Sequence, residues 1–354
     1  MAVFTTVDDA GSFFNPVLYT GTGAILGVTG TGFQPDAVWI KQRNGTGNNV
    51  FFDSVRGATE YFIVNTSAAN NTSTTDNLTA FDSDGFTLGA DSSGEVNASA
   101  GPIYVSYNWK AGTTTGIAGS PSITPDGYSF NATSGFSIIE YTGNGTSGAT
   151  IPHGLGVAPK FILVKNVAFS SWGVQQAASF MGPTRFMYFD EAQAEQSATD
   201  KWNDTAPTST LVSLGDSSIV NTNTQAYVAY CFAEIQGYSK MGEYVSNGNA
   251  DGPFIYTGFR PAFVIAKITD ASDSWAMLDN KRAGYNNVNY RLRVNQNTAE
   301  SQASPSYIDI LSNGFKIRLV DQEINSTSAG AEYIYMAWAE APLVNSSGVP
   351  VNAR

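Results

Sequence analysis

The sequence predicts an all-β protein made of three tandem β-sandwich repeats of about 100 residues, and two observations lead to this prediction. The first is composition, because 42% of the 354 residues are hydrophobic and 12% aromatic, but only 14% are charged, against roughly 25% in an average soluble domain. The second is a ten-residue phrase that occurs three times, as GFQPDAVWIK (32–41), GVAPKFILVK (156–165) and GFRPAFVIAK (258–267). A phrase repeated at this spacing indicates a duplicated structural unit.

Each phrase is interpreted as the central strand of one module. A proline precedes four consecutive apolar residues, where its missing N–H does least harm to a strand ladder, and the apolar run indicates a strand buried on both faces. A lysine follows the run, and we expect it to end the strand at the water. This structural signature consists of Pro35, Lys41, Pro159, Lys165, Pro261 and Lys267.

The other landmarks of each copy also indicate β structure. Each copy has an aromatic strand near its end, YVSYNW (104–109), YVAYCF (227–232) or YIYMAW (333–338). The first two alternate large and small residues, which suits a pleated surface. The turns in FDSDGFTLG (81–89) and LSNGFKIRL (311–319) are hairpin signals, because Asp-Gly and Asn-Gly accept positive φ. Residues 190–202 are the one segment for which a short helix is expected.

The landmarks divide the chain into six segments. Residues 111–135 are rich in Gly, Ser, Thr and Pro and are expected to act as a linker, so that the first module is set apart while the second and third pack closely.

Two assemblies remain open, a homotrimer of chains, which is favoured, and a pseudo-threefold body within one chain. The boundaries are an N-terminal docking arm (1–16), sandwiches at 17–112, 135–238 and 239–342, a linker (113–134) and a C-terminal tail (343–354).

Several of these segments together resemble a repeat of bacteriophage virion proteins, cyanophage proteins included. The resemblance is carried by GFQPDAVWIK, DSVRG, FDSDGFTLG and NWKAG in the first copy, by YTGNGTSGATIPHGLGVAPKFILVKN and WNDTAPTS in the second, and by YVAYCFAEIQGYSKMGEYVSNGNADGPFIYTGFRPAFVIAK. It covers most of residues 13–342. The resemblance implies lectin-like, jelly-roll-like β-sandwich modules and a place in the virion, after assembly in the host cytoplasm. It implies other virion proteins as partners through the termini, and a host surface glycan or receptor.

Charge and cysteine content exclude several classes of function. The net charge is −12 and no run of Lys and Arg occurs, which argues against nucleic acid and against an anionic membrane surface. The single cysteine, Cys231, cannot form an internal disulfide. The start of the chain does not resemble a signal peptide, no run is long enough to span a membrane, and no cofactor is expected.

The residue types that carry catalysis are scarce. His153 is the only histidine, and counting six residues back from each repeated proline pairs it with Thr29 and Ile255, so we interpret it as a turn residue and not a catalytic one. Cys231 is interpreted as a small buried residue, and one Cys with one His excludes a zinc site. DSDG (82–85) fits a hairpin better than a calcium loop, although a calcium ion held by several loops stays open.

Features that differ between the copies are the better candidates for recognition. Residues 169–207 are the least repetitive part of the chain. Trp172 matches Trp275 of the third copy and is expected in the core, whereas Trp202 has no partner and is the candidate ligand-binding residue, stacking on a sugar or packing on another subunit. DSVRG (53–57) and DNKRAG (279–284) share an Asp and an Arg, such as Asp53 and Arg56, which predicts a structural ion pair or a turn.

Taken together, these observations predict a non-enzymatic structural protein of the phage particle. The preferred interpretation is a tail-fibre or tail-associated component that contributes to host attachment. The alternative is a capsid decoration or head-fibre protein with a purely structural role. The third is a glycan depolymerase, since a carboxylate pair could hydrolyse glycans without His or Cys.

Overall fold

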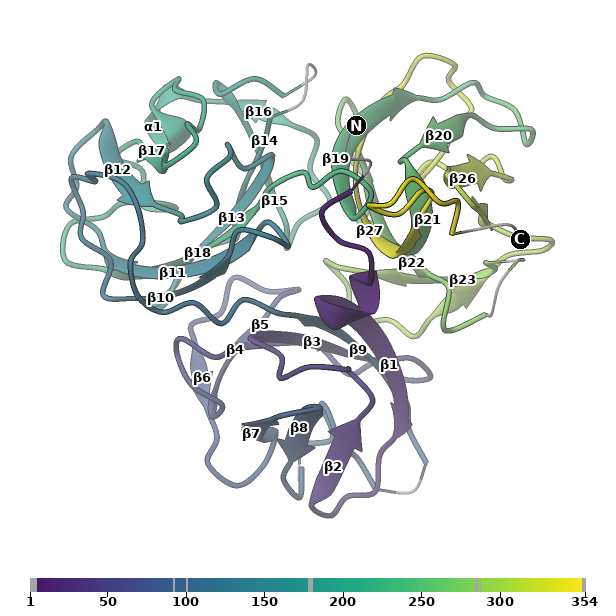
Figure 1. The fold of residues 1–354 in the computed structure, drawn as a ribbon, viewed down its shortest axis with the longest axis horizontal. Coiled ribbons are helices and arrows are strands. Elements are labelled where there is room, and N and C mark those ends of the chain that lie inside the picture. Colours follow the sequence, from purple (N-terminus) through teal and green to yellow (C-terminus); the bar gives the residue numbers. More distant parts are fainter. Residues whose placement is uncertain are drawn as a thin grey trace.

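Three β-sandwiches surround a common centre in the computed structural model, which describes residues 5–91, 93–99, 101–177, 181–283, 286 and 288–351. Each sandwich has a large antiparallel sheet that faces the centre and a small sheet on the outside (Figure 1). The prediction of an all-β protein is therefore confirmed. Two short helical segments complete the described elements, η1 (Ala10–Ser12) and α1 (Thr199–Trp202).

The three large sheets have the same strand order, apart from one additional edge strand in sandwich 2, and in each the last strand of the large sheet along the chain lies next to the central strand. In sandwich 1 the large sheet is β1 (Phe14–Thr20), β9 (Ile103–Trp109), β3 (Ala37–Gln42), β4 (Asn49–Asp53), β5 (Glu60–Ile63) and β6 (Asn71–Thr72), and the small sheet is β2 (Leu26–Thr29), β8 (Gly85–Leu88) and β7 (Leu78–Asp82). In sandwich 2 they are β10 (Gly127–Asn131), β11 (Phe136–Thr142), β18 (Ala226–Phe232), β13 (Phe161–Asn166), β14 (Gly173–Gln176), β15 (Arg185–Tyr188) and β16 (Gln196–Ser197), with β12 (Ala149–Pro152) and β17 (Leu211–Leu214). In sandwich 3 they are β19 (Ser239–Val245), β27 (Glu332–Pro342), β21 (Phe259–Ile268), β22 (Ala276–Asp279), β23 (Tyr290–Arg293) and β24 (Ser301–Gln302), with β20 (Phe254–Tyr256), β26 (Gly314–Ile317) and β25 (Ile308–Leu311).

The repeated phrase forms the central strands β3, β13 and β21, and both faces of these strands are buried. Side chains alternate between two cores because neighbouring residues of a strand point to opposite faces. In β3, Val38 and Ile40 face the interior of their own sandwich, whereas Ala37 and Trp39 face a core shared by the three sandwiches. The continuous apolar run in the sequence thus reflects two hydrophobic environments, one on each side of the sheet.

Three aromatic rings, one from the end of each last strand, meet in the shared core. The ring centroids of Trp109 and Trp338 are 5.4 Å apart, those of Phe232 and Trp338 are 5.5 Å apart, and those of Trp109 and Phe232 are 6.2 Å apart, all edge to face. The three residues occupy the same register position, opposite Phe14 of β1, Phe136 of β11 and Ser239 of β19. They mark a pseudo-threefold axis within one chain.

Sandwich 1 is not set apart, and the linker expectation is wrong. The inner face of its large sheet is as apolar as the other two and contributes to the same core. Part of the expected linker forms β10, which pairs with β11 as an edge strand of sandwich 2, and Ile123 is buried in the core of that sandwich. Small polar residues in this segment therefore accompany a strand and its turns, not a flexible spacer.

Equivalent backbone hydrogen bonds join the three sandwiches in a ring. In each bond, the carbonyl two residues beyond the repeated lysine accepts an N–H from the neighbouring sandwich. The pairs are Asn70 N to Val167 O (2.7 Å), Glu195 N to Thr269 O (2.8 Å) and Glu300 N to Arg43 O (2.7 Å).

The repeated lysines are buried at these junctions, so the expectation that they end the strands at the water is wrong. Lys41, Lys165 and Lys267 have no exposed surface. Lys41 Nζ donates to three carbonyls, including Asn297 O of sandwich 3 (3.1 Å), and Lys165 Nζ reaches Ser67 O of sandwich 1 (3.5 Å) as well as two nearer carbonyls. Lys267 Nζ donates to two carbonyls of its own turn. Burial lowers the pKa of each of the three amines to about 8.

Two of the three junctions also contain a buried Tyr–Asp–Arg cluster. Asp53 and Arg56 form the predicted ion pair, with 2.6 Å between Oδ2 and Nε, and the Tyr230 hydroxyl of sandwich 2 donates to the same carboxylate (2.6 Å). The same arrangement joins sandwiches 1 and 3 through Tyr107, Asp279 and Arg282.

The third junction lacks this cluster. Gln176 occupies the register position of Asp53, and Met336 that of Tyr230. The Gln176 amide instead donates to Gly242 O of sandwich 3 (3.0 Å). The two substitutions fit each other, because an unpaired buried carboxylate beside a thioether would be strongly unfavourable.

Local elements agree with the sequence to different degrees. The two hairpin predictions are confirmed, since Asp82 faces Gly85 and Leu311 faces Gly314 across tight turns. A Cβ on either glycine would lie within 2.0 Å of a carbonyl of the adjacent strand. The expected helix is reduced to Thr199–Trp202, because residues 196–197 form a strand. Of the expected terminal segments, residues 1–4 and 352–354 lie outside the described residues.

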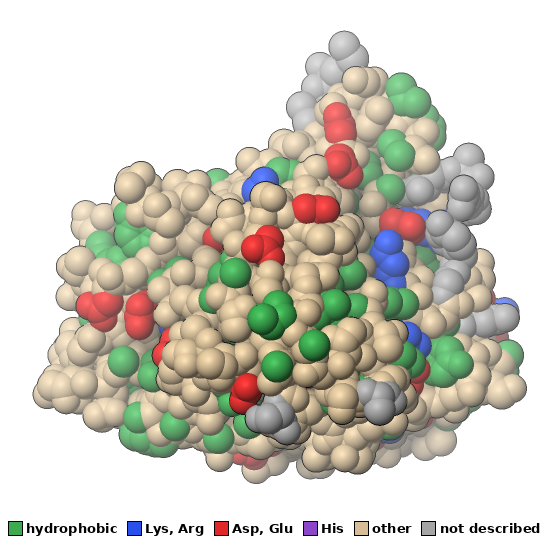
Figure 2. All heavy atoms as spheres, turned by 90° about the horizontal axis from the view of Figure 1, so that it is seen from below, with side chains coloured by type: hydrophobic (Ala, Val, Ile, Leu, Met, Phe, Trp, Pro, Cys, Tyr) green, Lys and Arg blue, Asp and Glu red, His purple; other side chains and the backbone are tan. Residues whose placement is uncertain are grey.

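The exterior is mainly neutral and polar, as the composition predicts. On the face in Figure 2, most of the surface is neutral and polar, apolar side chains lie in small groups, acidic side chains are scattered between them, and basic side chains are few. None of the described helices is long and apolar enough to cross a membrane.

We expect Trp338→Ala to lower the free energy of unfolding by about 3–5 kcal/mol, because it empties the centre of the shared core. Trp338→Phe is the matched control, since the equivalent position in sandwich 2 already holds Phe232, and it should cost less than half as much. Denaturant unfolding followed by circular dichroism measures both. Equal losses for the two variants would contradict the role of the three-ring contact.

We expect Arg282→Met to lower the free energy of unfolding by about 3–5 kcal/mol, because it leaves the buried carboxylate of Asp279 without its counter-charge. Arg185→Met removes the half-exposed pair with Glu195 and should cost no more than about 1 kcal/mol. The same denaturant measurement compares them. A small effect of Arg282→Met would mean that Asp279 becomes protonated without difficulty in the folded protein.

Candidate functional site

His153 has a structural role. It is fully buried, its Nδ1 accepts the N–H of Leu155 (3.3 Å), and its Nε2 lies 3.2 Å from the carbonyl oxygen of Thr208. The ring is thus the tautomer that carries its proton on Nε2. Burial lowers the pKa of His153 to about 4, so both nitrogens serve the fold at neutral pH.

The structural counterparts of His153 are Thr31 and Thr257. Each threonine hydroxyl bonds to the carbonyl two residues ahead, and the next residue in all three copies is a glycine with φ between 72° and 84°. The expected matches, Thr29 and Ile255, are wrong because the second copy has two additional residues between this turn and the repeated proline. The imidazole replaces a hydroxyl as the side chain that fixes the turn.

The remaining candidates for chemistry also have structural positions. Cys231 is buried, and burial raises the pKa of its thiol to about 12. Asp84 accepts the N–H of Gly32 (2.7 Å), and Asp82 accepts the hydroxyl of Thr87 (2.7 Å), so both acids of the DSDG turn are bound by the protein itself. Within the described ranges, no three His, Cys, Asp or Glu side chains cluster closely enough to hold a metal ion.

Trp202 lies inside sandwich 2, and the suggestion that it stacks on a sugar is wrong. Its side chain has no exposed surface and belongs to the hydrophobic core of that sandwich. The position corresponds to Leu78 of sandwich 1, since the N–H groups of Gly89 and Gly215 donate to the carbonyls of Asn77 and Lys201, the residues just before Leu78 and Trp202. Trp172, which is expected in the core, is buried together with Trp275 in the core that the three sandwiches share.

A different surface carries aromatic rings that the fold does not require. In β20, Ile255 is buried between Phe254 and Tyr256, whose side chains are 45% and 53% exposed. The positions that flank the buried residue hold Gly27 and Thr29 in sandwich 1. In sandwich 2 they hold Thr150 and Pro152. The other two sandwiches therefore show that non-aromatic residues suffice at these two positions.

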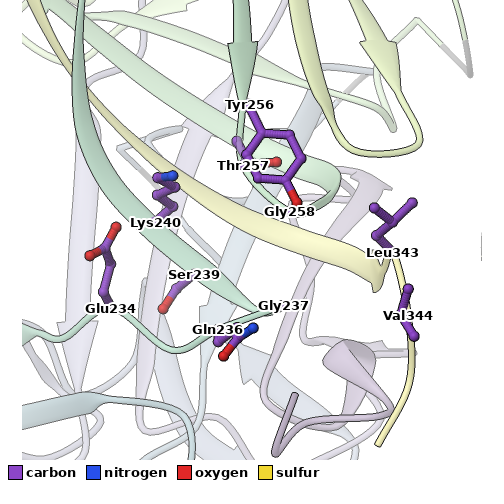
Figure 3. A pocket seen from close by; sticks show the side chains of 10 residues that line it. All are labelled: Glu234, Gln236, Gly237, Ser239, Lys240, Tyr256, Thr257, Gly258, Leu343 and Val344. Atoms are coloured by element: carbon purple, nitrogen blue, oxygen red, sulfur yellow. The ribbon is translucent and has the colours of Figure 1, made fainter. Parts of the chain in front are cut away.

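Tyr256 borders a hollow of about 390 Å³ at the edge of sandwich 3 (Figure 3). One wall is the turn that leads from sandwich 2 into β19, with Glu234 and Gln236, and the start of β19 provides Lys240. The opposite wall is the turn after β20, and Leu343 closes the hollow from the segment that follows β27. Residues from three stretches of sequence thus line one opening.

The hollow combines one aromatic ring with two opposite charges. Lys240 Nζ lies 5.6 Å from the centroid of the Tyr256 ring, a distance at which a cation is attracted to the ring face. Desolvation raises the pKa of Glu234, although Lys240 and Lys160 and a hydrogen bond from the N–H of Met241 act in the opposite direction. The site therefore offers an apolar face, donors from an ammonium group and acceptors from a carboxylate.

The sequence contained a signal for this site. The buried centre of each small-sheet strand can be aligned across the copies from the threonine or histidine turn that follows it, and only the third copy has aromatic residues on both sides, at Phe254 and Tyr256. Trp202 was the more conspicuous residue because its neighbours are polar, but a polar neighbourhood in a turn does not show which way a side chain points.

We expect His153 to make the stability depend on pH between about 6.5 and 4. The unfolded chain binds a proton near pH 6.5, whereas the folded protein resists protonation down to about pH 4. Since the unfolded state binds more protons in this window, stability falls as the pH falls, by up to about 1.4 kcal/mol per pH unit. Denaturant unfolding at several pH values measures the slope.

The matched variant is His153→Thr, which introduces the residue found at both counterpart positions. Carboxyl groups titrate alike in both proteins, so the difference between the two slopes reports on His153. Equal slopes would mean that the buried imidazole accepts a proton as readily as an exposed one.

Comparison with known proteins gives one result. Neither a curated protein nor a solved structure matched the chain. A protein-family model, described only as a domain of unknown function, matches residues 9–342 and so includes all three sandwiches and Tyr256. The chain belongs to this family, the domain of unknown function DUF7483.

Proposed function

We propose that the protein is a non-catalytic structural component of a bacteriophage particle that contributes to attachment to the host cell. The observation that carries this proposal is the exposed pair Phe254 and Tyr256, found at positions where the other sandwiches have non-aromatic residues. Exposed aromatic rings beside a hollow are typical of recognition surfaces. The resemblance of the repeats to those of phage virion proteins supplies the biological setting.

The architecture is suited to display. The three sandwiches share one core, so the outer small sheets are held on a rigid body. A binding site on such a body loses little conformational entropy when a ligand binds. Residue types that often perform catalysis have structural partners here, as His153 has Thr208 and Leu155.

The rival proposals differ in where the protein lies and what it does. A capsid decoration protein would lie on the head and would not adsorb to cells. A glycan depolymerase would lower the viscosity of host polysaccharide. A tail-fibre or tail-associated protein adsorbs to cells, competes with the phage and appears at the tail in cryo-electron microscopy of the particle.

We expect fluorescently labelled protein to adsorb to cells of the host bacterium and to slow phage adsorption. The double variant Phe254→Ala/Tyr256→Ala should lose at least about tenfold in cell binding, because aromatic anchors dominate many interfaces. The control is Leu18→Ala/Ile25→Ala, which removes two exposed apolar side chains of sandwich 1 and should bind normally. Flow cytometry measures cell-bound protein.

Absence of adsorption by the unaltered protein would contradict the attachment role. Equal adsorption by both double variants would leave attachment standing but place it on another surface. Cleavage of the host polysaccharide would favour the depolymerase.

A further inference from the structure

We propose that the hollow beside Tyr256 binds a neutral hexopyranose unit, whose ring stacks on Tyr256 while its hydroxyl groups bond to Lys240 and Glu234. The inference rests on the proposed function only in that a host-surface molecule occupies this site. It adds the chemical class of the ligand and the role of each side chain.

The aromatic ring selects a ligand with a flat apolar face. About half of the Tyr256 side chain is exposed, and the ring borders an opening whose volume of about 390 Å³ lies within the range of small-molecule sites. The C–H groups on one side of a pyranose provide such a face, and an aromatic ring with a polar tip can pack on them while its hydroxyl remains hydrated. A linear polyol has no comparable surface.

The polar groups select hydroxyls. An ammonium group is only a donor and a carboxylate only an acceptor, whereas a hydroxyl is both. Lys240 lines the hollow, and its Nζ lies 5.6 Å from the centroid of the Tyr256 ring, so its ammonium group lies beside the ring on which the sugar would stack. Neighbouring hydroxyls on one sugar ring can accept from Lys240 and donate to Glu234 at the same time.

The charges favour a neutral ligand over an ionic one. An acidic sugar placed near Lys240 would also lie near Glu234, and it would approach a chain with a net charge of −12. A cationic ligand would meet the ammonium of Lys240. A neutral sugar avoids both repulsions and uses both groups as hydrogen-bond partners.

The test is saturation-transfer NMR with the full chain and five sugars, namely glucose, galactose, mannose, glucuronate and galacturonate, supported by an array of neutral and acidic oligosaccharides. At least one neutral hexose should bind, with higher affinity than either uronate. Tyr256→Ala should weaken binding about tenfold, whereas Tyr256→Phe should retain it, because the ring and not the hydroxyl does the stacking. Ile25→Ala is the control on sandwich 1.

Variants at the charged residues separate the hydrogen-bond roles. Lys240→Met and Glu234→Gln should each weaken binding of the neutral sugar, and Glu234→Gln should improve the relative affinity for a uronate. Circular dichroism checks that each variant is folded.

Several results would overturn the proposal: no binding of any neutral saccharide, tighter binding of the acidic ones, or neutral-sugar binding that Tyr256→Ala leaves unchanged. The adsorption experiment keeps this outcome distinct from the attachment role. If cells still bind the protein through Phe254 and Tyr256 but no neutral sugar does, the site stands and its ligand class is wrong. If cells do not bind it at all, the attachment role fails whatever the sugars show.

Discussion

The edge-to-face contact of Trp109, Phe232 and Trp338 is the constraint on which the rest of the structure depends. A β-sandwich alone buries one face of each sheet and leaves the other to water. Here the second face of each large sheet meets the other two, so every central strand must be apolar on both faces. This requirement explains why the chain repeats a continuous apolar run, where a lone sandwich would show alternation.

Burial at the centre also determines the polar groups at the junctions. Strand ends and turns that would face water in an isolated sandwich are covered by a neighbour, and their carbonyls need donors. The repeated lysines supply these donors, at the cost of desolvating an ammonium group, as the lowered pKa of Lys41 shows. The Tyr–Asp–Arg clusters perform the same task, and the exchange to Gln176 and Met336 shows that matched partners matter more than particular residue types.

The sequence predicted the β class, the strands and the hairpins because these depend on local pattern, as with the turn at Gly85. It did not predict the burial of Lys41, because periodicity does not show that another sandwich covers the end of the strand. It placed Trp202 on the surface for a similar reason. Polar neighbours in the sequence are compatible with a tryptophan that points inward as well as with one that points outward. The match of His153 failed on a two-residue insertion, which spacing from a proline cannot detect.

The three sandwiches resemble one another at the shared core and differ on their outer sheets, and these two features have different physical origins. At the centre, a substitution in one sandwich alters a surface that the other two contact. Such a substitution is therefore tolerated only together with matching substitutions in the sandwiches that it contacts. On the outer sheets, a half-exposed side chain such as Tyr256 lies outside the shared core, and the equivalent position holds Thr29 or Pro152 in the other sandwiches. An exposed ring gains nothing from burial in the isolated protein. The outward positions of β20 are therefore where the chain can acquire a binding function in one sandwich without disturbing the other two.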